Sequence, residues 1–295
     1  MTTNKYVLAI GELLVDALST EQVTDLSQAK QLNVHAGGST ANFCRYLRRC
    51  GTNAHIVSAI GNDGFGKILL HELEKDGLST ANIQQHAKHF TSLIIVARTA
   101  GTPDFIPYRD ADKFIENIDS QLLQHAAWVH STAFALSANP SRSSILSAFE
   151  QAHRLGVPVS VDWNYSDKIW ANIAEAKSVL AYVQQFMPYL KFSLDDVSRY
   201  TGITNISIDQ ALEFLENLNA SVICLTCGGD GVYYKDKKSD WQFIAAQPIE
   251  VKNATGAGDS FWAGYVHAQL SGATVESCVQ NAVRVASLKL QGLLV

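Results

Sequence analysis

The sequence predicts an α/β fold built on a central, mostly parallel β-sheet with helices on both of its faces. Short apolar runs that end at glycine or polar residues alternate along the chain with segments of helical periodicity. Successive parallel strands need a crossover connection, and this is usually a helix. The chain has 295 residues, of which 47% are hydrophobic and 17% charged, enough for a large buried core.

The expected strands are short apolar runs, and the expected helices have apolar residues at three- and four-residue intervals. The strands cover residues 6–10, 55–60, 127–130, 157–161 and 221–225. The clearest helices cover residues 41–50, 65–76, 142–155, 173–185 and 208–218. We expect a single domain over residues 1–295, because no repeat or low-complexity linker divides the chain.

Two segments depart from this alternation. Residues 13–36 are polar with scattered apolar positions and have no helical period. Residues 92–110 contain two apolar runs on either side of a Gly-Thr-Pro turn at 101–103, a pattern that predicts a hairpin. We expect strands from about 13–36 and 92–110 to form a small antiparallel layer outside the main sheet.

The charge balance argues against two classes of partner. The chain has 23 Lys and Arg residues against 28 Asp and Glu, so neither nucleic acid nor a membrane is expected as a partner. The first residues do not have the pattern of a secretory signal, and we expect a cytoplasmic location. The odd count of five cysteines argues against a disulfide framework, and Cys224 and Cys227 are interpreted as core residues.

Glycines and carboxylates gather directly after the expected strands. They do so at residues 11–16, 61–64, 162–164 and 228–231. Ligands of an open parallel sheet bind beyond the carboxyl ends of its strands. These four segments together therefore favour a ligand site at that edge.

A glycine-rich turn at residues 255–260 precedes an apolar helical segment. Small residues let the backbone approach a ligand, and unpaired amides at a helix start favour a phosphate that gains negative charge. We expect the amides of Gly256, Ala257 and Gly258 to stabilise a transferred phosphoryl group. Asp259 would accept the proton of the attacking hydroxyl. Taken alone, the turn also fits a structural helix start capped by Asp259, and it is not a Walker A loop because the lysine is missing.

Three motifs together resemble those of the PfkB, or ribokinase-like, family of carbohydrate kinases. They lie at residues 37–42, 60–66 and 253–261, and the similarity extends from about residue 11 to residue 286. The resemblance implies a three-layer ribokinase-like fold with a small β lid. It also implies an ATP-dependent sugar kinase that uses Mg²⁺.

The resemblance further implies a sugar site under the lid, next to Asp259. Asp16 matches the carboxylate that holds sugar hydroxyls, and Gly37, Gly38 and Asn42 match further sugar contacts. Helix capping is the alternative role for Asn42. A buried sugar hydroxyl left without a partner costs about 1–3 kcal/mol, so polar groups are needed there.

Residues that flank the expected hairpin are candidates for contacts from the lid. Either Arg98 or Arg109 is expected to reach the sugar or a phosphate on it, although both also fit as solvated lid charges. Tyr108 is expected to cover the sugar or to pack the lid itself. The lid also has an apolar edge, which leaves a homodimer through the lid open.

The nucleotide side of the implied site follows two glycine-rich segments. The residues expected to bind ATP are Ser193, Thr226, Gly228, Gly231, Gly256, Gly258 and Asn281. For Asn281, a solvated helix face is the alternative. Asp196 stands where the family usually has a glutamate, and we expect it to contact Mg²⁺ through water.

The family motif around Asp259 commonly begins with Asp, but here it begins with Asn253. In many members that carboxylate helps to hold a monovalent cation such as K⁺. The side chain of Asn253 offers an oxygen without the charge. We therefore expect weak or absent activation by K⁺.

The substrate expected from the resemblance is fructose. Asp162 and Asn164, followed by Trp170, and the pair Lys191 and Ser193 are similar to fructokinase-like members. The alternatives are 2-keto-3-deoxygluconate, then ribose or a nucleoside. A relative without catalysis that senses sugar is a more distant alternative, which the retained Asp259 disfavours.

Overall fold

The structure is a computed structural model that describes residues 5–99 and 105–294. Its main sheet has the strand order β13-β12-β11-β10-β9-β8-β1-β4-β5. The strands are β1 (Tyr6–Ile10), β4 (Ala54–Gly61), β5 (Ile83–His86), β8 (Ala126–Thr132), β9 (Val159–Asp162), β10 (Tyr189–Ser193), β11 (Val222–Thr226), β12 (Gly231–Asp236) and β13 (Gln242–Ala245). The pairs from β5 to β11 are parallel, whereas β12 and β13 form an antiparallel edge.

Helices connect most of these strands. They are α1 (Ser39–Arg49), α2 (Gly64–Lys75), α3 (Ser120–His125), α4 (Ser141–Arg154), α5 (Ile173–Val183), α6 (Leu194–Thr201), α7 (Ile208–Glu216), α8 (Ala257–Leu270) and α9 (Val275–Leu290). The short 3-10 helices are η1 (Leu26–Gln28), η2 (Ala111–Lys113), η3 (Ala135–Ser137) and η4 (Gln184–Phe186). Within residues 5–99 and 105–294, no helix combines the length and hydropathy needed to cross a membrane.

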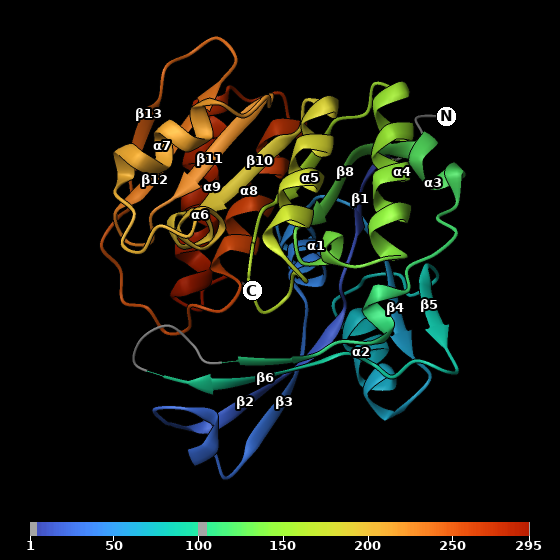
Figure 1. The fold of residues 1–295 in the computed structure, drawn as a ribbon. Coiled ribbons are helices and arrows are strands. Elements are labelled where there is room, and N and C mark those ends of the chain that lie inside the picture. The colour runs from blue at the N-terminus through green and yellow to red at the C-terminus, as the bar shows by residue number, and fades with distance from the viewer. Residues whose placement is uncertain (1–4, 100–104, 295) are drawn as a thin grey trace.

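Both faces of the main sheet are covered, which confirms the predicted three layers. Along β1, Leu8 faces a core shared with α3 to α7, and the next residue, Ala9, faces a core shared with α1, α2, α8 and α9. This alternation is the two-residue period of a strand, and it explains why β1 is apolar at every position. In Figure 1, α4 and α5 lie in front of the sheet, with α8 and α9 behind it.

A second sheet projects below the main one in Figure 1 and forms the lid. Its order is β3-β2-β6-β7, with β2 (Leu14–Gln22), β3 (Leu32–Gly37), β6 (Leu93–Arg98) and β7 (Phe105–Tyr108). The prediction of a purely antiparallel layer is wrong, because β2 and β6 pair in parallel. The two antiparallel pairs, β2–β3 and β6–β7, are joined side by side at this seam. The expected turn at 101–103 lies outside the described residues.

The expected boundaries agree with the structure to within a few residues, and six short elements were not expected. Strand β1 has the predicted bounds, and α8 begins directly after the glycine turn. The unexpected elements are β5, β10, β12, β13, α3 and α6. Since the parallel strands end at one edge of the sheet, the polar residues that follow β1, β9, β10 and β11 meet there.

Candidate active site

The glycine turn that opens α8 has a backbone that only small residues fit. Gly256 has a φ of 76°, in the left-handed region, and it caps α8. A Cβ on Gly258 would lie 2.8 Å from Nζ of Lys191, so a larger residue would displace this lysine. The amide of Ala257 donates to the carbonyl oxygen of Ala254 at 3.1 Å. That amide is thus occupied within the turn.

Asp259 lies in the first turn of α8 and contacts the first turn of α1. Its Oδ1 accepts a hydrogen bond from Oγ of Ser39 at 2.5 Å, and its Oδ2 accepts one from Nδ2 of Asn42 at 3.0 Å. Burial raises the pKa of Asp259, and these two hydrogen bonds oppose that shift. The carboxylate is therefore fixed in orientation while it remains a stronger base than an exposed aspartate.

Asn42 is held by a further pair of residues. Its Oδ1 accepts from Nη1 of Arg45 at 2.9 Å, and Nε of Arg45 pairs with Asp76 at 2.6 Å. Because Arg45 donates to the oxygen of the amide, the nitrogen of that amide faces Asp259. The side chain of Asn42 therefore does not cap the helix here, since it is directed at the carboxylate.

The two glycines before α1 allow the chain there to pack closely against Asp16 and the backbone of Glu12. A Cβ on Gly37 would lie 2.1 Å from Oδ2 of Asp16, and one on Gly38 would lie 2.5 Å from the carbonyl oxygen of Glu12. Gly38 also has a φ of 98°. Burial, followed by repulsion from Asp259, raises the pKa of Asp16 to about 7. Asp16 and Asp259 thus belong to one electrostatic site.

A buried ion pair lies beside the glycine turn, and the sequence analysis did not assign it to the site. Nζ of Lys191, in β10, is 3.0 Å and 3.1 Å from the two carboxylate oxygens of Asp162, at the end of β9. The side chains are 6% and 4% exposed. Burial disfavours the charge of Lys191, but attraction to Asp162, Asp196 and Asp259 outweighs it and raises the pKa. A lysine inside the apolar run of β10 was the available signal.

Ser193 and Asp196 form a reciprocal cap at the start of α6. The amide of Asp196 donates to Oγ of Ser193 at 3.1 Å, and the amide of Ser193 donates to Oδ2 of Asp196 at 2.8 Å. Burial raises the pKa of Asp196 to about 6, against the attraction of Lys191. Over the described ranges, no group of three or more His, Cys, Asp or Glu residues could hold a metal ion by itself. Carboxylates at this spacing fit Mg²⁺ that is bound mainly through phosphates and water.

Four of the seven residues predicted to bind ATP border a cavity of about 450 Å³ between the β11–β12 turn and α9, whereas Ser193 and Gly256 do not line it. Thr226, Gly228, Gly231 and Gly258 line it, as the sequence analysis expected for a nucleotide site. Asn281 is not among its lining residues, because Nδ2 of Asn281 donates to the carbonyl oxygen of Gly264 at 2.8 Å. The α9 residues that do line it were not predicted; they are Val283, Ala286, Ser287 and Leu290.

A second cavity, of about 420 Å³, lies between the lid and the loop before α8. Its walls include His35, Arg98, Lys252 and Asn253. Ala254 borders both this groove and the nucleotide-side cavity. The loop at 252–255 therefore separates two ligand-sized spaces, and Gly256, Ala257 and Gly258 link this loop to Asp259.

The register of the lid separates two of the predicted sugar contacts. Asp16 pairs with Ile94, and Ile94 pairs with Pro107, so these side chains share one face of the lid. Tyr108 is next along β7 and its side chain points to the opposite face. It is 58% exposed. The structure thus does not bring Tyr108 to the face that carries Asp16.

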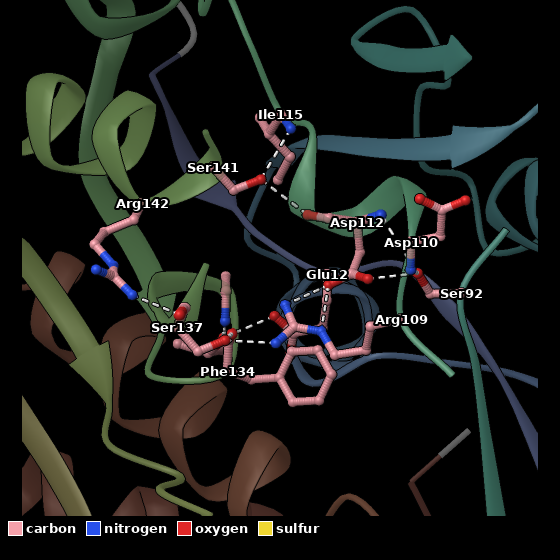
Figure 2. A network of polar contacts seen from close by, with 12 residues as sticks. Glu12, Ser92, Arg109, Asp110, Asp112, Ile115, Phe134, Ser137, Ser141 and Arg142 are labelled. Carbon is pink, nitrogen blue, oxygen red and sulfur yellow. Dashed lines mark hydrogen bonds and ion pairs between the residues drawn. The ribbon is translucent and has the colours of Figure 1, made fainter. Parts of the chain in front are cut away.

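Arg109 is turned into the body of the protein rather than toward the groove. Figure 2 shows its guanidinium between Asp112 and Ser137, above the ring of Phe134. Nε of Arg109 is 2.9 Å from Oδ2 of Asp112, and Nη1 is 2.5 Å from Oγ of Ser137. Arg109 therefore anchors the end of β7, and Arg98 is the hairpin arginine that lines the groove.

The residues that favoured fructose fall into two groups. Asn164 and Trp170 contact other parts of the protein body, whereas Asp162 and Lys191 lie beside the glycine turn. Oδ1 of Asn164 accepts a hydrogen bond from the amide of Phe134 at 3.0 Å. Trp170 stacks on Trp163 with ring centroids 6.2 Å apart, and both are buried. Trp163 and Trp170 belong to the hydrophobic core, whereas Asp162 and Lys191 approach the glycine turn itself.

A family model, related sequences and a solved structure that resemble this chain are all described as carbohydrate kinases. A family model described as pfkB family carbohydrate kinase matches residues 4–293. An ATP-dependent 6-phosphofructokinase of Thermoanaerobacterium thermosaccharolyticum is 32% identical over 97% of this chain and 88% of its own length. Fructokinase-1 of Oryza sativa subsp. japonica is 28% identical over 88% of this chain and 81% of its own. The structure of Halothermothrix orenii fructokinase superposes with a TM-score of 0.83 at 31% identity, over 95% of this chain and 98% of that one.

Proposed function

This chain belongs to the pfkB family of carbohydrate kinases, and we propose that it transfers the γ-phosphoryl group of ATP to a hydroxyl of fructose. One observation carries the chemical part of the proposal. The glycine turn links Asp259 to the loop that separates the nucleotide-side cavity from the lid groove, and Ser39 and Asn42 hold Asp259 in place. A buried, oriented carboxylate close to such a loop is suited to general base catalysis.

The reaction assigned to this site is an in-line transfer. The acceptor hydroxyl loses its proton to the carboxylate of Asp259, and its oxygen forms a bond to the γ-phosphorus. The bond between that phosphorus and the oxygen that bridges to the β-phosphate breaks, and ADP leaves. Each oxygen of Asp259 accepts one hydrogen bond in the structure and retains a lone pair for the incoming proton.

Several groups of the chain would stabilise the negative charge of the transferred group. The amide of Gly258 lies in the first turn of α8, at the positive end of the helix, while that of Ala257 is already bonded within the turn. Lys191 adds a buried ammonium beside Gly258. Mg²⁺ bound with the nucleotide would neutralise phosphate charge, and Asp162 and Asp196 are the carboxylates that would hold it through water.

The acceptor is proposed as fructose because relatives at 28% and 31% identity are named fructokinase. Asp16, Gly37, Gly38 and Asn42 are the residues proposed to bind it. Fructose 6-phosphate is a second candidate, since the relative at 32% identity is named 6-phosphofructokinase. The basic residues of the lid groove, among them Arg98, would suit a phosphate on the acceptor.

The deciding experiment is an ADP-release assay with purified protein, Mg²⁺ and ATP. The acceptors are fructose, fructose 6-phosphate, 2-keto-3-deoxygluconate, ribose and adenosine, each tested over a range of concentrations. Fructose should give the highest kcat/KM. A value at least tenfold higher for any other acceptor would replace fructose, and no turnover with any of them would favour a sugar-sensing relative.

The base is tested separately with Asp259→Asn. This change keeps the size of the side chain but removes its basicity, so kcat should fall by about 10²–10⁴ while KM for ATP changes little. Turnover near that of the wild type would show that Asp259 is not the base.

The lid also supports a homodimer, which the sequence leaves open. Val34, Ala17, Ile95 and Ile106 form one row across the sheet on the face away from Asp16, and Val34 and Ile106 are 43% and 41% exposed. Two such faces could cover each other. Sedimentation velocity of the wild type and of Val34→Lys tests this, because the charge should shift a dimer toward monomer.

A further inference from the structure

Two hydrogen bonds join the end of α9 to the loop that leads into the catalytic turn. Nζ of Lys289 donates to the backbone carbonyl oxygen of Asn253 at 2.7 Å. The amide of Lys252 donates to the carbonyl oxygen of Leu290 at 2.9 Å. The first of these bonds is made by an ammonium group, so it is charge-assisted and stronger than a neutral one.

Asn253 is the first of a short series of contacts that ends at Asp259. Its side-chain Oδ1 accepts a hydrogen bond from the amide of Thr255 at 2.9 Å. The carbonyl oxygen of Ala254, next in the chain, accepts from the amide of Ala257, the first residue of α8. A shift of the Asn253 backbone would therefore be passed on to the first turn of α8.

Lys289 also affects the charge of the catalytic turn. Its side chain is only partly exposed. Burial lowers the pKa of Lys289, and attraction to Asp259 opposes this shift. In return, Lys289 is among the cations that counter the raised pKa of Asp259. Asn253 itself has no charge, so Lys289 brings positive charge into direct contact with the loop, at a carbonyl oxygen.

We propose that Lys289 is a positioning residue whose ammonium acts as a built-in monovalent cation for the loop before the catalytic turn. Carbonyl oxygens bind K⁺ and ammonium alike, and a tethered ammonium would make an external cation unnecessary. The inference rests on the proposed role of Asp259. It goes beyond the expectation of weak K⁺ activation, because it assigns the cause to one side chain. A lysine that only stabilises the end of α9 would not create a cation requirement when removed.

The test uses Lys289→Met and Lys289→Arg, assayed with tetramethylammonium as the sole monovalent cation and again with K⁺ or NH₄⁺. Wild type and Lys289→Arg should give the same kcat in both buffers. Lys289→Met should lose about tenfold in kcat in tetramethylammonium, as expected for one lost charge-assisted hydrogen bond. K⁺ or NH₄⁺ should restore at least half of the wild-type value.

A binding readout that does not depend on turnover accompanies the kinetics. K⁺ should raise the Tm of Lys289→Met relative to tetramethylammonium and leave the Tm of the wild type unchanged. Lys75→Met is the matched control, since Lys75 also lies in the last turn of a helix, is exposed and is remote from the loop. It should respond like the wild type in both measurements.

Three results would overturn the proposal. The first is strong activation of the wild type by K⁺, which requires no variant to fold. The second is wild-type kcat of Lys289→Met in tetramethylammonium. The third is a folded Lys289→Met that no cation restores or stabilises. Failure of the proposed base would be distinct, because it would appear as an active Asp259→Asn whatever the cation.

Discussion

Glu12, directly after β1, is the carboxyl whose burial should most clearly affect stability. It is 1% exposed and accepts three hydrogen bonds at the start of α1 and the end of β8. The donors are the amide of Ser39 at 3.0 Å, Oγ1 of Thr40 at 3.0 Å and Oγ1 of Thr132 at 2.7 Å. Burial raises the pKa of Glu12 from 4.5 to about 7, in spite of the hydrogen bond from Thr132.

The sign of the effect follows from proton binding. The folded protein holds the Glu12 proton more tightly than the unfolded chain, so the free energy of unfolding falls as the pH rises from 4.5 to about 7. The shift corresponds to roughly 3 kcal/mol in full, at 1.36 kcal/mol for each pKa unit, and most of it should be lost between pH 5 and 8. Glu12→Gln removes the titration and keeps the shape of the side chain.

The measurement is equilibrium unfolding in urea, followed by tryptophan fluorescence at pH 5 and pH 8. Between these values, the stability of Glu12→Gln relative to the wild type should rise by about 2–3 kcal/mol. Glu21→Gln is the control, since hydrogen bonding from Thr20 lowers the pKa of Glu21, the opposite direction to Glu12. A relative stability of Glu12→Gln that does not change with pH would refute the reasoning.

Three further changes test the site. Lys191→Met should lower kcat by at least about 10², because it removes a cation beside the transferred group and leaves Asp162 buried without its partner. Steady-state kinetics measures this loss, on variant protein whose circular dichroism spectrum matches that of the wild type. The kcat/KM for the acceptor should fall below about pH 7, where Asp16 gains a proton and no longer accepts two hydrogen bonds, and Asp16→Asn should flatten this part of the pH profile. Arg98→Gln should reduce kcat/KM for fructose 6-phosphate by about tenfold and that for fructose by less than twofold, and equal losses would contradict a phosphate contact.

The catalytic turn could be predicted from sequence because its chemistry is local. Glycines that permit a left-handed backbone, followed by a helix start and a carboxylate, occupy consecutive positions, and the structure has this arrangement at Gly256 to Asp259. The partners of Asp259 could not be derived in this way. Ser39 and Asn42 are more than 200 residues away, and only the packing of α1 against α8 brings them into contact.

The side-chain directions in the lid depended on strand pairing. Along a strand the two faces alternate, so a shift of one residue moves a side chain from one face to the other. Tyr108 was expected near the sugar. Because Ile94 pairs with Pro107, however, it is Pro107 and not Tyr108 that lies on the face of the lid that carries Asp16. Asn281 was a similar case on a helix, since the face of α9 that borders the cavity depends on how it packs against α8.

Lys191 could have been identified from the sequence. A lysine in the middle of an apolar strand needs a buried partner, and Asp162 ends the neighbouring strand in the predicted parallel sheet. What the sequence did not indicate was the distance of this pair from Gly258. That distance depends on how far the glycine turn extends over the ends of the strands.

The parallel seam of the lid has a consequence for how the protein folds. Val15 pairs with Leu93, so the centre of the lid joins two segments that are separated in the chain by α1, β4, α2 and β5. Closing so long a loop is slow, and contacts of this kind form late in folding. The lid therefore cannot fold as an autonomous hairpin. The acceptor pocket should be the last part of the N-terminal half to form during folding and the first to unfold.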